Sequence, residues 1–203
     1  MSALWALDLA FADVVASTSD ARLGAIRMAW WRERLEALDT LSDAPAEPRL
    51  RAAQSELIVR GFTGAELSRL EDGWLPLLQP IPWGAEVAEG LKLRGRLLFA
   101  IGARILGGEP EDAEAAGALW SLVDGARHCS DVLSRMALLE EARRAIARLP
   151  SPKPPKKVRR LTGLAAMAAH DALRNRPLDL PYYDAGRGIA ALTHYLRGSL
   201  PRG

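Results

Sequence analysis

The residues best suited to chemistry lie between positions 117 and 131, where the sequence reads GALWSLVDGARHCSD. Asp124, His128 and Asp131 are spaced i, i+4 and i+7, which predicts one helix face if a single helix runs through Gly125. Two carboxylates and an imidazole can bind Zn²⁺, Mn²⁺ or Fe²⁺, or move protons. We favour the alternative, a polar stripe lining a groove with His128 paired to one aspartate and Arg127 pointing elsewhere, because residues i and i+7 lie about 10 Å apart.

A second set of candidate residues lies near the N-terminus. Arg27, Trp31 and Arg34 share a helix face and could hold an anion beside an aromatic wall. The alternative, which we favour, is a seam between helices from which the arginines reach into water. We assign no catalytic residue and no metal ligand in either set.

Length and composition limit the kind of protein. A chain of 203 residues with 49% hydrophobic residues predicts one domain, over residues 1–203, with a substantial core. The lone cysteine, Cys129, fits a reducing compartment. No apolar run approaches the roughly 20 residues that span a bilayer, and the first residues lack a basic segment typical of secretory signals. We therefore expect a cytoplasmic protein.

The pattern of helix-forming residues, without strand-type alternation, predicts an all-α fold: a single helical bundle of about eight helices. In the second helix, Ile26, Trp30, Trp31, Leu35 and Leu38 are expected to form a wide apolar stripe. The stretch 75–82 is expected to be a loop or an irregular crossing, the stretch 177–181 a loop, and 151–157 (SPKPPKK) a stiff connector. The expected helices cover residues 3–16, 20–41, 48–61, 63–73, 85–106, 110–149 with a kink near Gly125, 158–175 and 185–197.

Charge is distributed unevenly along the chain. Residues 151–203 hold 10 Lys and Arg against 3 Asp and Glu, a net charge of +7, whereas residues 1–150 hold 17 against 22, a net of −5. A basic C-terminal region can face anionic lipid, nucleic acid or a diphosphate, or be an ordinary solvated surface. Aromatic residues of the kind that stack on bases are not interleaved there, so we expect no nucleic-acid partner. Contact with a membrane surface, peripheral to the bilayer, stays open.

Three segments together resemble the squalene/phytoene synthase family, which has the isoprenoid-synthase fold and acts in terpenoid biosynthesis. The first, LWALDLAFADVVAS followed by LGAIRMAWWRERLEAL, is similar to the family's first aspartate-rich helix and the helix after it. The second, LKLRGRLLFAIGARILGG (91–108), resembles its mid-chain helix of small and apolar residues. The third, residues 117–131, resembles its second aspartate-rich helix. The resemblance implies two facing helices whose aspartates bind the Mg²⁺ ions that neutralise a departing diphosphate.

This sequence departs from the family pattern at the metal ligands. The outer carboxylates of the first motif are replaced by Ala12 and Ala16, and Asp13 points about 100° away from their face. In the second motif Arg127 is kept, but His128 stands where the first aspartate is expected. Asp131 falls one residue before the next aspartate position. We therefore expect no Mg²⁺ cluster of the usual kind and no cofactor.

Two hypotheses follow from this resemblance. In the first, the protein is a catalytically degenerate relative, a pseudoenzyme that binds an isoprenoid ligand or a protein partner. The segment from Arg27 to Trp31 is similar to one in a mitochondrial branch of the family that assists assembly of respiratory complex I. In the second, it is an active prenyltransferase that joins isoprenyl diphosphates with Mg²⁺ in an altered site. The few carboxylates on the two motif helices favour the first.

Overall fold

The structure of the chain, a computed structural model, describes residues 1–40, 45–150, 153–174 and 185–201. Over these residues the regular secondary structure consists of α-helices and short 3-10 helices, without a strand, which confirms the predicted all-α class. Internal contacts divide the chain into two units, Met1–Pro80 and Ile81–Gly203, and each is described by itself. The single domain predicted over residues 1–203 stays a prediction.

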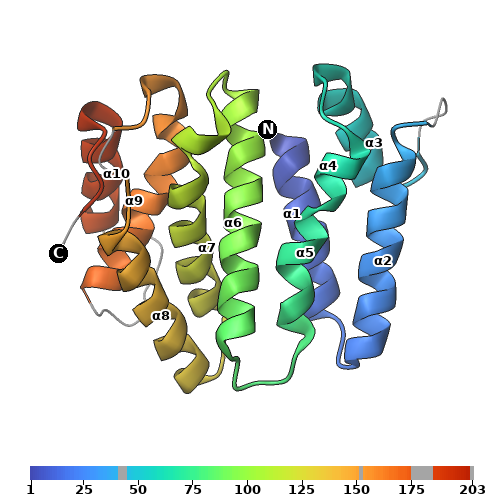
Figure 1. The fold of residues 1–203 in the computed structure, drawn as a ribbon, viewed down its shortest axis with the longest axis horizontal. Helices are drawn as coiled ribbons and strands as arrows, with labels where there is room; N and C mark the ends of the chain where they lie inside the picture. Colours follow the sequence, from blue (N-terminus) through green and yellow to red (C-terminus); the bar gives the residue numbers. More distant parts are fainter. Residues whose placement is uncertain (41–44, 151–152, 175–184, 202–203) are drawn as a thin grey trace. The chain divides into compact units, whose positions relative to one another are not determined.

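The first unit is built from two longer helices and three shorter ones (Figure 1). Local signals set their boundaries. The Asp20 carboxylate accepts hydrogen bonds from the first turn of α2, Thr63 Oγ1 accepts one from the Glu66 amide, and Pro48 occupies the first turn of α3. The helices are α1 (Ser2–Ala16), α2 (Ala21–Ala37), α3 (Pro48–Glu56), α4 (Gly64–Ser68) and α5 (Leu70–Trp74), with 3-10 helices at Ile58–Arg60 and Leu75–Leu78.

The apolar stripe predicted for α2 is wrong in part. Trp31, Leu35 and Leu38 are buried, but Ile26 and Trp30 are 66% and 41% exposed. Met28 and Gly24 complete the buried face instead, and the Leu78 side chain fills the space where a Gly24 Cβ would lie. The α2 face that packs is thus rotated from the expected one, and it runs through Gly24, Met28, Trp31 and Leu35.

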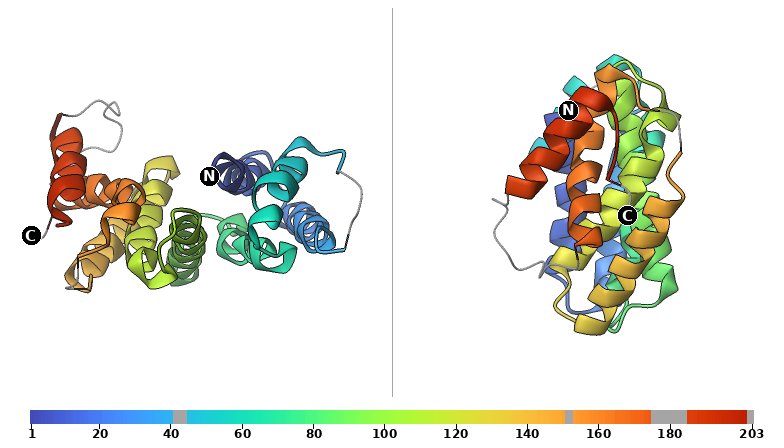
Figure 2. Two further views of the ribbon diagram at one scale, coloured as in Figure 1. Left: turned by 90° about the horizontal axis from the view of Figure 1, so that it is seen from above. Right: turned by 90° about the vertical axis from the view of Figure 1, so that its left-hand side faces the viewer.

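The second unit is organised around α7, which contacts α6, α8 and α9, while α10 packs against α9. Figure 1 shows α6, α7 and α9 running side by side, and the right-hand view of Figure 2 shows α10 in front of α9. The helices are α6 (Ala85–Ile105), α7 (Glu114–His128), α8 (Val132–Ala147), α9 (Arg159–Leu173) and α10 (Ala185–Arg197), with 3-10 helices at Pro110–Asp112 and Lys156–Val158.

Two glycines allow α6 and α7 to approach closely. A Cβ atom built on Gly95 would lie 2.5 Å from the carbonyl carbon of Gly117 and 2.8 Å from the Ser121 Cβ. A Cβ built on Gly117 would lie 2.7 Å from the carbonyl carbon of Gly95. Because real side chains do not tolerate such distances, both positions need glycine at this helix–helix contact. The contact fixes Arg94 of α6 opposite the polar residues of α7.

The kinked helix predicted over residues 110–149 is wrong. A 3-10 helix precedes α7, Cys129 is extended with φ −88° and ψ 124°, and α8 begins at Val132. The predicted helices 48–61 and 63–73 are likewise shorter or divided: α3 ends at Glu56, and the chain bends between α4 and α5. Some predicted elements lie wholly or partly outside the described residues. These are the loop 177–181, residue 41 of the second predicted helix, residue 175 of the seventh, and the first two residues of the 151–157 connector.

None of the helices over the described ranges is both long and apolar enough to cross a membrane.

Candidate functional site

The predicted stripe of Asp124, His128 and Asp131 is divided between two helices. Asp124 and His128 belong to the last turns of α7, whereas Asp131 is the N-cap of α8. The Asp131 carboxylate accepts hydrogen bonds from the Ser134 hydroxyl at 2.6 Å and from the Ser134 amide at 2.7 Å, and these lower its pKa. The three residues therefore do not share a helix face, because Asp131 and Ser134 favour a new helix start over a continuous helix.

The Asp124 carboxylate pairs with an arginine from α6. Arg94 Nη1 lies 2.8 Å from Asp124 Oδ2, and the Arg94 guanidinium lies 4.9 Å from the centre of the Trp120 ring. Arg94 is only 4% exposed, so the pair is largely shielded from water. On the other side of Asp124, His128 Nδ1 lies 2.8 Å from the backbone carbonyl oxygen and 3.6 Å from Oδ1. The His128 ring is itself mostly exposed.

Arg127 belongs to a second buried ion cluster. Its Nη2 lies 2.6 Å from Asp171 Oδ2 on α9, and Arg187 Nε on α10 lies 3.4 Å from the same oxygen. Asp171 and Arg187 are 5% and 8% exposed. Neither Asp171 nor Arg187 is among the site residues predicted from the sequence. A signal was present, because Asp171 lies with His170 in a segment of mostly small apolar residues, where a buried carboxylate needs a charged partner.

A small cavity lies beside both clusters. It has a volume of about 260 Å³ and contacts Asp124, Arg127 and Asp171 as well as apolar residues of α7 and α9. Trp120 forms part of its lining and stacks on Phe99 of α6, with ring centres 5.5 Å apart. The arrangement is a small mixed pocket whose charged side chains are committed to ion pairs.

The candidate residues of the first unit have structural contacts. Asp13 is exposed, and its carboxylate lies 2.6 Å from Arg49 Nη2. Arg27 Nη1 donates hydrogen bonds to the Ser17 and Thr18 hydroxyls, which ties α2 to the turn after α1. Trp31 is buried, and its ring packs against Phe11 at 6.2 Å and against Trp30 at 5.2 Å.

Arg34 lies over a different ring from the predicted one. Its guanidinium is 5.9 Å from the Trp30 ring centre, so it stands beside the exposed tryptophan and not beside Trp31. Trp31 is buried, Arg27 contacts Ser17 and Thr18, and Arg34 lies over Trp30, so these three side chains do not form an anion site along one aromatic wall, the reading that we did not favour from the sequence.

The carboxylates of α1 do not fit a Mg²⁺ site. Asp8 is buried and accepts a hydrogen bond from the Trp74 indole at 2.9 Å, while Asp13 is engaged by Arg49. Magnesium requires several oxygen ligands in an octahedral array, and these two carboxylates diverge on the helix. Within the described part of the chain, no group of three or more His, Cys, Asp and Glu side chains converges as metal ligands would.

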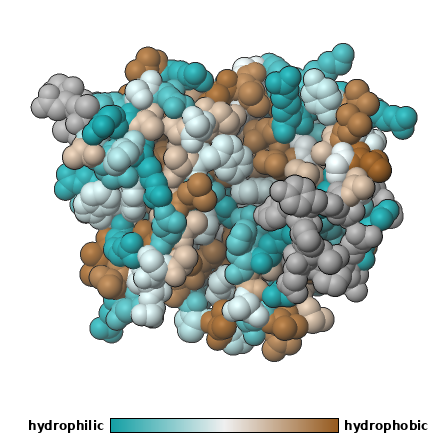
Figure 3. Space-filling model, turned by 180° about the vertical axis from the view of Figure 1, so that it is seen from behind, coloured by the Kyte–Doolittle hydropathy of each residue, from teal (hydrophilic) through white to brown (hydrophobic). Residues whose placement is uncertain are grey.

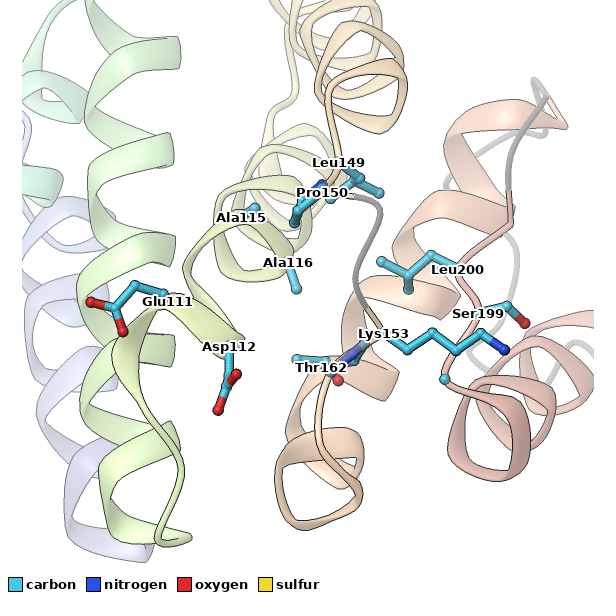
Figure 4. Close-up of a pocket in the computed structure, with 12 residues that line it drawn as sticks. Glu111, Asp112, Ala115, Ala116, Leu149, Pro150, Lys153, Thr162, Ser199 and Leu200 are labelled. Carbon is cyan, nitrogen blue, oxygen red and sulfur yellow. The ribbon is translucent and has the colours of Figure 1, made fainter.

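A larger cavity of the second unit lies elsewhere and was not predicted. It has a volume of about 590 Å³, and Figure 4 shows Ala115, Ala116, Leu149, Pro150 and Leu200 around it. Polar side chains stand at its edges: Glu111 and Asp112 on one side, and Lys153 and Ser199 on the other (Figure 4). These residues come from separate stretches of sequence, which explains why no local pattern indicated the cavity.

A buried histidine supports one wall of this cavity. Thr162, which lines the cavity, lies with its hydroxyl 2.7 Å from His194 Nε2, and His194 Nδ1 lies 3.2 Å from the Ser199 carbonyl oxygen. His194 is fully buried, and burial lowers its pKa, with the nearby Arg159 charge acting in the same direction. A neutral ring satisfies both contacts when Nδ1 carries the hydrogen, because the carbonyl of Ser199 can only accept.

A scan against models of known protein families finds no match for this chain, and searches of curated proteins and of solved structures find none either. The likeness to squalene/phytoene synthases stays a prediction.

Proposed function

We propose that this chain is a non-catalytic binding protein, related to squalene/phytoene synthases as its three motif segments suggest, that holds an isoprenoid-type ligand in the cavity of Figure 4. The cavity of about 590 Å³ carries this proposal. Its volume lies within the range of about 300–1,000 Å³ typical of small-molecule sites, and its walls are mainly aliphatic. An isoprenoid chain offers the branched apolar surface that such walls bury.

The charges at the cavity edge favour a ligand with an uncharged polar end. Lys153 provides one cation, while Glu111 and Asp112 provide two carboxylates. Asp112, the last residue of its 3-10 helix, also accepts a hydrogen bond from the N-cap Glu109 amide at 3.0 Å, which orients its carboxylate. A diphosphate would meet net repulsion from this set, whereas a hydroxyl can donate to a carboxylate. A prenyl alcohol is therefore the expected ligand class.

The contacts of the motif aspartates support the non-catalytic part of the proposal. Asp124 pairs with Arg94, Asp13 pairs with Arg49, and Asp131 caps α8. A divalent ion would have to displace an arginine or a helix cap to reach any of these carboxylates. Their present roles are structural.

Calorimetric titration of the full chain with farnesol and geranylgeraniol in detergent-free buffer tests the ligand. We expect saturable binding, and at least tenfold weaker binding for Ala116→Leu, because about three added carbon atoms occupy the space of the ligand. Ala137→Leu adds the same group at an exposed position of α8 and should leave affinity unchanged. Ala115→Leu repeats the test from a half-buried position if Ala116→Leu lowers the melting temperature. If Ala116→Leu, Ala115→Leu and Ala137→Leu all bind the ligand with wild-type affinity, the cavity is not the binding site.

A pyrophosphate-release assay with farnesyl or geranylgeranyl diphosphate, plus Mg²⁺ or Mn²⁺, tests the alternative of an active prenyltransferase. We expect no release above the protein-free control. Turnover that disappears in Asp124→Ala and Asp131→Ala would replace the binding proposal with the enzymatic one.

A further inference from the structure

The last helix of the second unit exposes its apolar face. Ile189, Leu192 and Leu196, spaced i, i+3 and i+7, are 64%, 58% and 65% exposed, and we call them the C-terminal apolar stripe. The opposite face of α10, which packs on α9, carries Arg187 and His194, both buried. An amphipathic helix of a globular protein normally buries its apolar side, so α10 is reversed.

The exposed apolar face of α10 indicates a surface that is covered when the protein functions. Scattered exposed apolar side chains are ordinary, but a continuous stripe on one helix is a feature of interaction sites. The space-filling view shows several separate apolar patches on the face turned away from the viewer of Figure 1 (Figure 3). The C-terminal apolar stripe differs from a random patch in its regular spacing and in the charges at its borders.

Arginines border the C-terminal apolar stripe. Arg174 and Ile189 line the same pocket, and Arg159 Nη1 donates hydrogen bonds to the carbonyl oxygens of Tyr195 and Leu196 at 3.3 and 3.2 Å. Arg197 ends the helix. In residues 153–174 and 185–201 the only carboxylate side chain is Asp171, which is buried and ion-paired.

We propose that the C-terminal apolar stripe and its arginine border bind the surface of an anionic lipid bilayer, with α10 lying in the plane of the interface. The apolar side chains enter the region between headgroups and acyl chains, and the arginines contact anionic headgroups. The positive charge of the arginine border is complementary to the negative charge of these headgroups.

A second copy of the chain fits this face less well. An isologous dimer places the same patch against itself, so the arginine border would meet its own like charges. The area is also small: four partly exposed side chains, Tyr195 included, offer a few hundred Å², less than the roughly 800 Å² per partner of a stable interface. A bilayer needs neither self-complementarity nor a large area.

Sedimentation of the full chain with sucrose-loaded vesicles tests the proposal. We expect the protein to bind vesicles of phosphatidylcholine with about 30% phosphatidylglycerol, and to bind pure phosphatidylcholine at least tenfold more weakly. Leu192→Ser should reduce binding to the anionic vesicles about tenfold, and adding Leu196→Ser should reduce it further. High salt should weaken wild-type binding because it screens the arginines.

A matched control lies on α8, where Leu133 and Met136 are 68% and 62% exposed without belonging to the C-terminal apolar stripe. Leu133→Ser and Met136→Ser should leave vesicle binding unchanged. All variants are exposed, so unchanged melting curves are expected and exclude misfolding as the cause.

Wild-type protein that stays in the supernatant with anionic vesicles would overturn the proposal, as would equal binding by the Leu192→Ser/Leu196→Ser variant. A wild-type dimer in light scattering that this double variant converts to monomer would overturn it in favour of self-association. None of the substituted residues lines the cavity of Figure 4, so this result is independent of ligand binding there.

Discussion

Replacing Gly95 by alanine is the sharpest test of how the second unit packs. The added methyl group would lie 2.5 Å from the carbonyl carbon of Gly117 and 2.8 Å from the Ser121 Cβ. Backbone atoms cannot rotate aside, so α6 and α7 must separate or tilt. Overpacking of this kind costs about 1–3 kcal/mol, and a rigid backbone neighbour places the cost at the upper end. The higher helix propensity of alanine offsets up to about 1 kcal/mol of this cost, so the free energy of unfolding should fall by about 2 kcal/mol.

Urea denaturation followed by circular dichroism measures this loss in the free energy of unfolding. For a chain of this size, a loss of about 2 kcal/mol corresponds to a fall of about 4–8 °C in melting temperature. Gly188→Ala is the matched control: it lies in α10, is exposed, and no atom lies within 4 Å of the point where a Cβ would stand. It should gain up to about 1 kcal/mol from helix propensity alone.

The double variant Gly95→Ala/Gly117→Ala tests the mechanism as well as the magnitude. Once the first methyl group has forced the helices apart, the second finds part of its space already open. The double variant should therefore lose less free energy of unfolding than the two single variants together. Gly95→Ala protein as stable as the wild type would refute the close approach of α6 and α7. Fully additive losses would refute helix separation as its consequence.

Three further substitutions test buried polar groups. Burial keeps the pKa of His194 below its usual 6.5 in the folded protein. Below about pH 6.5 the unfolded chain therefore binds a proton at this histidine more readily than the folded protein, and the free energy of unfolding falls as the pH drops. His194→Gln should flatten the dependence of the urea midpoint on pH in this range. Asp171→Asn removes the anion that Arg127 contacts at 2.6 Å and should lower the free energy of unfolding by about 3 kcal/mol. Trp74→Phe removes the indole donor to buried Asp8 and should cost about 1–3 kcal/mol by the same measurement. Unchanged unfolding curves would contradict the last two.

Helix positions followed from local signals in the sequence. Asp20, Pro48 and Thr63 each act within four residues, by capping an amide or fixing a backbone angle, and each starts a helix as predicted. The range 185–197 was predicted for the last helix and is observed. Such interactions are readable without knowledge of tertiary structure.

Which face a helix buries was harder to predict. Ile26 was expected in the core and is exposed, while the apolar face of α10 points outward. Hydrophobic periodicity identifies an apolar face of a helix but not the element that it packs against, and the buried residues of α10 are Arg187, Ala190 and His194. The boundary between α7 and α8 was also missed. The hydrogen bond from the Ser134 amide to Asp131 starts a new helix there, and hydrophobic periodicity alone does not show whether such a cap forms or the helix continues.

The candidate site depends on pairings between distant parts of the sequence. Asp124 and Arg127 stood out from their spacing, but their partners Arg94 and Asp171 lie 30 and 44 residues away. No local pattern connects them. The pairs exist because the glycine contact sets α6 against α7, and because α9 packs on the other side of α7.

These pairings connect stability to the proposed function. A metal ion bound to Asp124 would take the carboxylate that neutralises Arg94, a side chain only 4% exposed. Removing one partner of a buried ion pair costs about 3–5 kcal/mol, a large part of the roughly 5–15 kcal/mol that stabilises a typical domain. Metal-assisted chemistry at α7 would therefore compete with folding. The cavity of Figure 4 is lined by neither residue, so the ligand binding proposed there would leave these buried ion pairs intact.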